Sequence, residues 1–172
     1  MNNDIIIRKA SLEDVNEICI LHVNSWNRTY KGIIDQEYLD NMKNNIEKRI
    51  ERMKREFGLR NIIVAIKNNE IVGFAEYISS NEFSKELDID CELCGLYIKN
   101  EYVKTGVGTK IFNYVKDKFK DENKKRMGLW CSKENINAIN FYTNKGGILS
   151  NEKTFNLDGK DYNEVAFIYE LN

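Results

Sequence analysis

Residues 96–109 read LYIKNEYVKTGVGT, and this stretch decides how the rest of the chain is interpreted. Its apolar start is typical of a strand, and Gly106 and Gly108 mark the beginning of a helix. Glycines at such a position leave the first-turn N–H groups open to an anion, which the helix dipole also attracts. The stretch therefore predicts a strand, a turn that binds a pyrophosphate with Lys104 as a further charge contact, and a helix. A turn without a ligand is the alternative.

Two other nucleotide-binding motifs fail on the same letters. A P-loop requires G-x-x-x-x-G-K-[ST], which residues 108–111, reading GTKI, do not supply. A dinucleotide fingerprint requires a third glycine three residues after the second, and Ile111 stands there.

Hydrophobic periodicity predicts an α+β fold in one domain over residues 1–172, with a mixed, mostly antiparallel sheet flanked by helices. The hairpin turns are expected at residues 68–70 and 158–159, Ser11 is expected to cap the first helix, and Gly146 and Gly147 are expected to end the last. Strands are expected at residues 5–7, 61–67, 71–79, 89–99, 127–131, 148–156 and 164–171, and helices at residues 15–26, 37–57, 107–119 and 135–145.

The composition favours a soluble, cytoplasmic protein. Lys and Arg number 26 and Asp and Glu number 27, so the net charge gives no case for a nucleic-acid or membrane partner. No stretch approaches the roughly 20 apolar residues that span a bilayer, and residues 1–4 lack the order of a secretory signal. Four cysteines are too few for a disulfide framework in a chain of 172 residues.

Two blocks carry a family resemblance. A strand followed by [QR]-x-x-G-x-[GA] is matched by residues 103–108 at both glycines, although Val103 stands where Gln or Arg is preferred. The pattern N-x-x-A-x-x-F-Y-x-x-x-G is matched by residues 135–146 at every named position, and Gly147 follows where Phe is usual. In this order the blocks resemble the GNAT superfamily of acyl-CoA-dependent N-acetyltransferases. Residues 22–34 resemble a common GNAT subgroup, mostly of undefined substrate.

The resemblance implies a GNAT-type fold and transfer of an acetyl group from acetyl-CoA, the cosubstrate, to a primary amine without a metal. A small-molecule acceptor is favoured over a protein. The alternatives are a catalytically silent CoA-binding sensor or interaction module, and an acetyltransferase for protein N-termini or lysines.

The resemblance also implies where the coenzyme lies. The pantetheine arm is expected to pair like an added strand with Leu96, Tyr97 and Ile98. Asn135, Ala138 and Tyr142 are expected near the same arm, and Asn135 is expected to cap its helix. The pyrophosphate is expected on the turn formed by Val103, Lys104, Thr105, Gly106, Val107, Gly108 and Thr109.

The expected catalytic groups are Glu92 and Tyr142. Glu92 is the candidate general base, acting directly or through water, although it also fits a polar strand residue. Tyr142 is the candidate general acid for the departing thiolate, and packing is its alternative role. Trp26, Tyr30 and Tyr38 are expected either to line the acceptor side or to pack.

Other residues are expected to have structural roles. Cys91 and Cys94 lie three apart on a strand and therefore point to opposite faces, which makes them a poor metal or disulfide pair. His22 lies on an apolar helix stripe and is interpreted as packing rather than as part of an acceptor pocket. Residues 46–57 present an amphipathic face that is the candidate surface for a homodimer.

Overall fold

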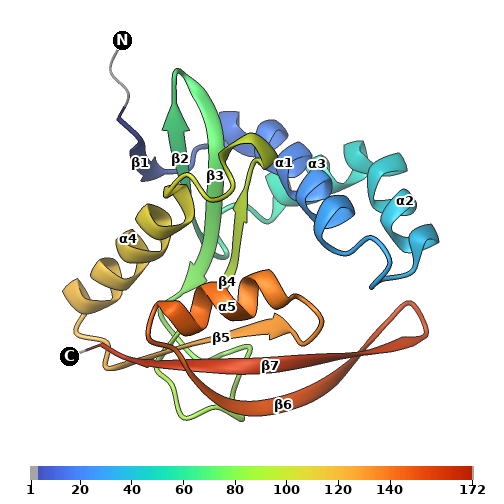
Figure 1. The fold of residues 1–172 in the computed structure, drawn as a ribbon. Helices are drawn as coiled ribbons and strands as arrows, with labels where there is room; N and C mark the ends of the chain where they lie inside the picture. Colours follow the sequence, from blue (N-terminus) through green and yellow to red (C-terminus); the bar gives the residue numbers. More distant parts are fainter. Residues whose placement is uncertain (1–3, 172) are drawn as a thin grey trace. The chain divides into compact units, whose positions relative to one another are not determined.

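A computed structural model describes residues 4–171. Seven strands form a mixed sheet with the order β1-β2-β3-β4-β5-β7-β6. Figure 1 labels the helices and strands and colours them along the sequence. The strands are β1 (Ile6–Lys9), β2 (Asn61–Lys67), β3 (Glu70–Ile78), β4 (Cys91–Ile98), β5 (Arg126–Ser132), β6 (Ile148–Leu157) and β7 (Lys160–Glu170). The helices are α1 (Val15–Thr29), α2 (Gln36–Asn44), α3 (Ile46–Arg55), α4 (Val107–Asp121) and α5 (Ile136–Asn144), with short 3-10 turns η1 (Leu12–Asp14) and η2 (Asn100–Tyr102).

The strand pairings confirm a mixed sheet. β4 and β5 pair in parallel, whereas β1 with β2, β2 with β3, β5 with β7 and β6 with β7 pair antiparallel. Among the helices of residues 4–171, none is long and apolar enough to cross a membrane.

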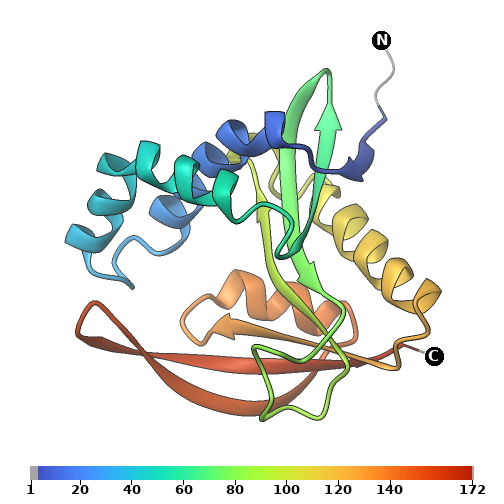
Figure 2. The ribbon, with the colours of Figure 1, turned by 180° about the vertical axis from the view of Figure 1, so that it is seen from behind.

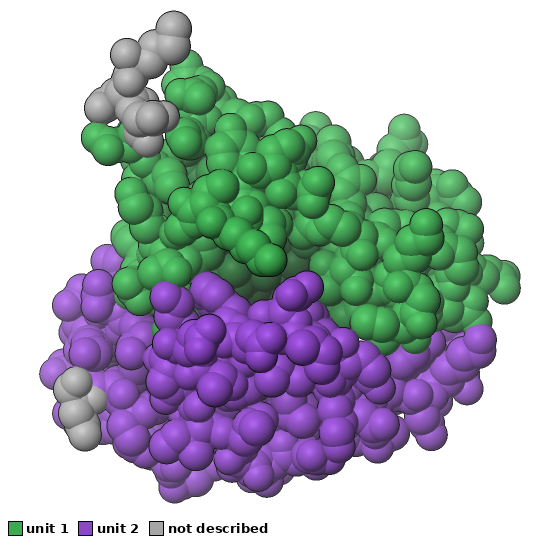
Figure 3. Space-filling model, in the orientation of Figure 1, with its two compact units in different colours: residues 1–77, 95–114 green, residues 78–94, 115–172 purple. Residues whose placement is uncertain are grey.

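The chain forms two compact units, which Figure 3 colours separately. Unit 1 comprises residues 1–77 and 95–114, and unit 2 comprises residues 78–94 and 115–172. The strand β4 and the helix α4 each contribute residues to both units.

The core of unit 1 lies between β2–β3 and the helices α1 and α3, which cover one face of these strands (Figure 2). Burying each large apolar side chain in such a core stabilises the fold by roughly 1.5–3 kcal/mol. Met53 and Phe57 of the expected homodimer face pack against this core, so this half of the face is used within the unit. The core cluster consists of Ala10, Ile18, Leu21, Ile62, Val64, Ile71 and Phe74.

The prediction of one helix over residues 37–57 is wrong, because the helix is interrupted at Asn45, which separates α2 from α3. The Asn45 side-chain amide donates to the Asn41 carbonyl at 2.9 Å, and its backbone N–H donates to the same carbonyl at 3.1 Å. Asparagine side chains compete in this way with helical hydrogen bonds, and periodicity alone does not detect the competition.

The start of α1 also differs from the prediction. Ser11 precedes η1, and both its N–H and its hydroxyl donate to Asp14 Oδ2, at 2.7 and 3.1 Å. Asp14 in turn accepts two hydrogen bonds from Arg8 at 2.6 and 2.8 Å. These Arg8 contacts lower the pKa of the Asp14 carboxyl to about 2. Ser11 is thus the N-cap of η1, which leads directly into α1, and its capping box with Asp14 fixes this junction together with the Arg8–Asp14 ion pair.

The hairpin turns occur where the sequence predicts them. Asn68 and Asn69 have φ values of 51° and 63°, and Asp158 and Gly159 have φ values of 53° and 83°. However, β7 begins at Lys160 instead of residue 164, because the polar residues after this turn continue the ladder with β6. Asn163 and Asp161 accept hydrogen bonds from Thr154 and Asn156 across that ladder.

In unit 2, α5 begins at a side-chain cap and ends at a glycine. Asn135 Oδ1 accepts from the Ala138 N–H at 3.1 Å, which confirms the predicted cap. Gly146, at φ +84°, ends the helix as expected. A Cβ at Gly147 would lie 2.5 Å from Tyr169 Oη, so this position has no room for the phenylalanine usual in the resembling family.

Candidate active site

The glycine turn of unit 1 has the backbone that an anion site requires. Gly106 has φ +90°, and among residues 4–171, its own atoms and its chain neighbours aside, no heavy atom lies within 4 Å of the position where its Cβ would be. Lys104 also adopts the left-handed region, at φ +62°. Val103, Lys104, Thr105 and Gly106 are all exposed. The turn therefore presents open backbone at the beginning of α4.

The first turn of α4 carries N–H groups that its own helix does not use. Lys110 is the first residue whose N–H bonds back, to the Gly106 carbonyl at 3.1 Å. The N–H groups of Val107, Gly108 and Thr109 come before it and have no acceptor inside the helix. Together with the helix dipole, they favour a diphosphate at this position.

The end of β4 precedes this turn and carries Leu96, Tyr97 and Ile98, all half-buried. Arg28 Nη2 donates to the Ile98 carbonyl at 3.2 Å. A carbonyl oxygen has two lone pairs, so a second donor can still bind there. The sequence reasoning missed Arg28, because its contact to Ile98 joins residues that are far apart along the chain.

The three aromatic residues expected on the acceptor side lie together. The Trp26 ring is 4.8 Å from that of Tyr30 and 6.3 Å from that of Tyr38, between centroids. Trp26 Nε1 is buried and has no hydrogen-bond partner among residues 4–171. An unsatisfied buried donor is unfavourable, so this N–H is a candidate contact for a ligand.

His22 packs among aromatic rings, as predicted. Its ring centroid lies 4.6 Å from that of Tyr97 and 5.8 Å from that of Trp26, both edge-on. Arg49 Nη2 lies 3.2 Å from Nδ1. Burial lowers the pKa of His22 to about 3, with the charge of Arg49 acting in the same direction. The imidazole is therefore neutral, and Nδ1 accepts the Arg49 hydrogen bond.

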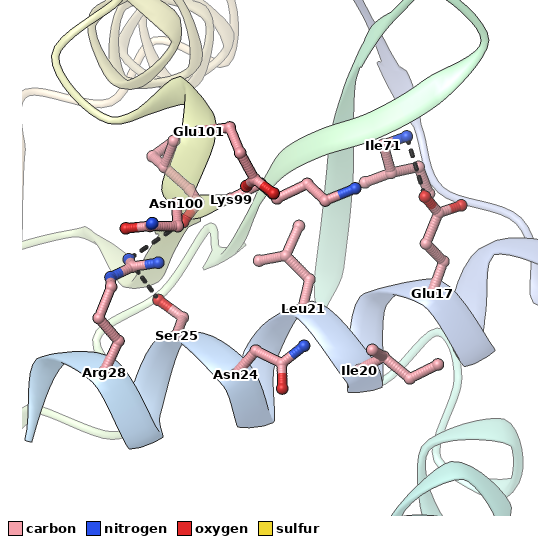
Figure 4. Close-up of a pocket in the computed structure, with 11 residues that line it drawn as sticks. Glu17, Ile20, Leu21, Asn24, Ser25, Arg28, Ile71, Lys99, Asn100 and Glu101 are labelled. Carbon is pink, nitrogen blue, oxygen red and sulfur yellow. Dashed lines mark hydrogen bonds between the residues drawn. The ribbon is translucent and has the colours of Figure 1, made fainter. Parts of the chain in front are cut away.

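A pocket of about 390 Å³ in unit 1 lies between α1 and the segment that follows β4 (Figure 4). Leu21 points into its centre, Glu17 accepts from the Ile71 N–H at 3.1 Å at one end, and Arg28 lies at the other. The expected acceptor residues Trp26, Tyr30 and Tyr38 do not line this pocket. Its wall on α1 is a second stripe at residues 17, 21, 24 and 28, which helical spacing could have revealed.

The candidate catalytic residues belong to unit 2. Glu92 lies on β4 beside Gly128 of β5, and only 5% of its surface is exposed. In the described part of the chain, the parallel pairing of β4 with β5 joins Cys91 to Met127 and Glu92 to Gly128. Burial raises the pKa of Glu164, which Lys153 lowers and the charge of Glu92 raises.

Tyr142 is a buried residue of α5 with 8% of its surface exposed. Its ring lies 5.3 Å from that of Phe141 and 5.8 Å from that of Phe167, and its carbonyl accepts from the Tyr169 hydroxyl at 2.8 Å. Ala138 lies about one turn earlier on the same helix, and its N–H donates to the side chain of Asn135, the N-cap of the helix. The phenol is thus held on a well-anchored helix.

The chain is similar to known N-acetyltransferases. The chain is 26% identical to the uncharacterised N-acetyltransferase YuaI of Bacillus subtilis, over 94% of this chain and 91% of the relative. It is 26% identical to spermidine N(1)-acetyltransferase of Thermoplasma acidophilum, over 91% and 92%. Its fold matches the crystal structure of PaiA N-acetyltransferase from Thermoplasma acidophilum in complex with coenzyme A, with TM-score 0.69 and 25% identity, over 94% of this chain and 98% of that chain.

Most of the chain also matches one protein family. Residues 20–146 match the acetyltransferase (GNAT) family. They include the glycine turn, Glu92 and Tyr142. The chain therefore belongs to the GNAT family of N-acetyltransferases.

Proposed function

We propose that the protein transfers the acetyl group of acetyl-CoA to a primary amine of a small molecule. The observation that carries this proposal is the open turn at residues 103–109, where the unused first-turn N–H groups of α4 follow a left-handed Gly106. Backbone N–H groups at a helix start bind a diphosphate without any particular side chain. The valine at position 103 therefore leaves this chemistry intact.

The relatives support the coenzyme and the kind of acceptor. The PaiA structure, which holds coenzyme A, shares its fold with this chain. Spermidine, named as the substrate of one relative, is a small molecule with primary amines. Trp26, Tyr30 and Tyr38 add an aromatic cluster that suits an alkylammonium group, because ring faces attract cations.

The residues of this chain have separate tasks in the transfer. An alkylammonium ion has a pKa near ~10.4 and must lose a proton before it attacks. Glu92 takes that proton, directly or through water. The amine nitrogen then forms a bond to the acetyl carbon, the carbon–sulfur bond breaks, and Tyr142 protonates the departing thiolate. Backbone N–H groups of residues 96–98 orient the thioester and stabilise the developing oxyanion.

The Tyr142→Phe variant tests the assignment of the general acid. Loss of a positioned acid should lower kcat by about 100-fold, while the dissociation constant of coenzyme A, measured by calorimetry, should change little. Glu92→Gln should lower the rate by a similar factor. Tyr162→Phe, which removes another phenol from unit 2, serves as the control and should retain activity.

Release of the coenzyme A thiol is followed with a panel of primary amines. Tight binding of coenzyme A without turnover of any amine or peptide would support a catalytically silent sensor instead. Equal rates for Tyr142→Phe and the unmodified protein would remove Tyr142 from the mechanism.

A further inference from the structure

On the sheet of unit 2, the ammonium group of Lys153 occupies a cage made of one aromatic ring and two carboxylates. Lys153 Nζ lies 4.0 Å from the centroid of the Trp130 ring, 3.4 Å from Glu86 Oε1 and 4.0 Å from Glu164 Oε2. Aromatic faces and carboxylates are the groups by which proteins recognise alkylammonium ions. The cage thus already binds a primary ammonium group, that of the chain itself.

The aromatic wall of this cage is held in place, whereas its occupant is a flexible side chain. Trp130 Nε1 donates to the fully buried Ser84 Oγ at 3.0 Å. Leu87 and Ile89, from the segment between β3 and β4, pack with Trp130. The Lys153 side chain is flexible by nature and 33% exposed. An external ammonium group that replaces Lys153 would therefore find the Trp130 ring already in place.

The cage lies on the same face of the sheet as the candidate base. Glu92 is beside Gly128, Trp130 follows two residues along β5, and Glu164 pairs with Ser132 two residues further. Side chains on a strand alternate between faces, so Glu92, Trp130 and Glu164 share one face. At about 7 Å for every two residues, the cage lies roughly 7–13 Å from Glu92 along the strands. The charge of Glu92 reaches Glu164, whose pKa it raises.

We infer that this cage binds the second ammonium group of a diamine or polyamine acceptor, and that Lys153 competes with it for the site. The inference rests on the proposed function in that Glu92 deprotonates the first amine of the same acceptor. Extended 1,4-diaminobutane and 1,8-diaminooctane place their nitrogens about 6 and 11 Å apart, from bond lengths near ~1.5 Å. This range of lengths matches the separation between Glu92 and the cage.

The test compares kcat/KM for each diamine with that for the monoamine of equal length, butylamine or octylamine. In Lys153→Met the internal competitor is gone, and the ratio of diamine to monoamine should rise by about tenfold, as expected for one added charge-assisted contact. In Glu164→Gln the ratio should fall by a similar factor. The double variant should lose the gain of Lys153→Met. Lys133→Met is the matched control, because Lys133 pairs with Glu152 at 2.8 Å and its loss changes the net charge equally.

Binding of the same amines is measured by calorimetry without acetyl-CoA. Tighter binding of diamines to Lys153→Met than to Lys153→Met/Glu164→Gln, without turnover, would support the cage while contradicting the proposed function. If every variant turned over the amines with the same ratio of kcat/KM for diamine to monoamine, the proposed function would stand and the cage would be overturned. Should Lys153→Met not fold, Glu164→Gln decides the question, because an unchanged ratio there also overturns it.

Discussion

At the residue scale, Gly106 connects backbone conformation to coenzyme binding. Gly106→Ala places a Cβ at φ +90°, which should lower the free energy of unfolding by about 1 kcal/mol. The same Cβ would crowd the anion, so we expect the dissociation constant of coenzyme A to rise about tenfold, or about 1.4 kcal/mol. Calorimetry and denaturant unfolding measure the two effects.

Gly58 offers a matched control for this variant. It has φ +98°, and its Cβ position is equally open to the described residues beyond its chain neighbours, but it follows α3. Gly58→Ala should lose similar stability and retain its affinity for coenzyme A. Equal affinities of the two variants would contradict a diphosphate at the turn.

His22 gives the protein a distinctive dependence of stability on pH. The folded pKa of His22 is about 3, below the unfolded value near ~6.5, so the unfolded chain binds the extra proton first. Stability is therefore fully present above about pH 6.5 and falls as the pH decreases towards 3, by about 1.5 kcal/mol between pH 6.5 and 5.

Urea unfolding at these two pH values measures this loss. His22 is the only histidine, so few other groups titrate in that interval. His22→Gln should be less stable at pH 7 but should show little change between pH 6.5 and 5. A persistent loss in that variant would show that another group is responsible.

At the element scale, the cap of α5 is a separable contribution. Asn135 Oδ1 accepts from the Ala138 N–H at 3.1 Å. Asn135→Ala should lower the free energy of unfolding by about 1 kcal/mol, whereas Asn135→Asp keeps an acceptor and should lose little. Thermal unfolding of both variants makes the comparison. If the two variants were equally stable, the cap would contribute nothing.

The elements themselves were largely predictable from the sequence. The seven strands, the glycine turn and the end of α5 at Gly146 follow from hydrophobic periodicity and turn residues. The break at Asn45 was not predicted, because a side-chain bond to the Asn41 carbonyl decides it. The early start of β7 was not predicted either, because Asp161 and Asn163 are polar and their place in the sheet depends on pairing with β6.

The candidate site was predictable only where it is local in sequence. The backbone of residues 103–109 follows largely from its own glycines, and Trp26, Tyr30 and Tyr38 lie close together in the sequence, at the end of α1 and in α2. Contacts between distant residues, such as Arg28 with Ile98 or Lys153 with Trp130, require the pairing of elements to be known. The roles of Glu92 and Tyr142 remain predictions that the variants above address.

At the scale of the whole molecule, the two units should unfold together. Both β4 and α4 contribute to each unit, so neither unit is complete when these elements are disordered. The chain has two tryptophans, Trp26 in unit 1 and Trp130 in unit 2. The fluorescence of Trp26→Phe then reports on unit 2, and that of Trp130→Phe reports on unit 1.

Their urea transitions, each compared with circular dichroism of the same variant, should have coincident midpoints. This result would support the single domain expected from the sequence. Two separate transitions within one variant would instead show independent units.

The position of β6 at the end of the strand order has a consequence for solubility. Its outer backbone groups are an open template on which another chain could add a strand and begin an aggregate. Charged residues and irregular register oppose such growth, and β6 has both: Glu152 and Lys153, and a register shift between Leu149 and Glu152. The charge of Lys153 thus also opposes the addition of another strand at β6, and a protein without this lysine should precipitate at a lower concentration.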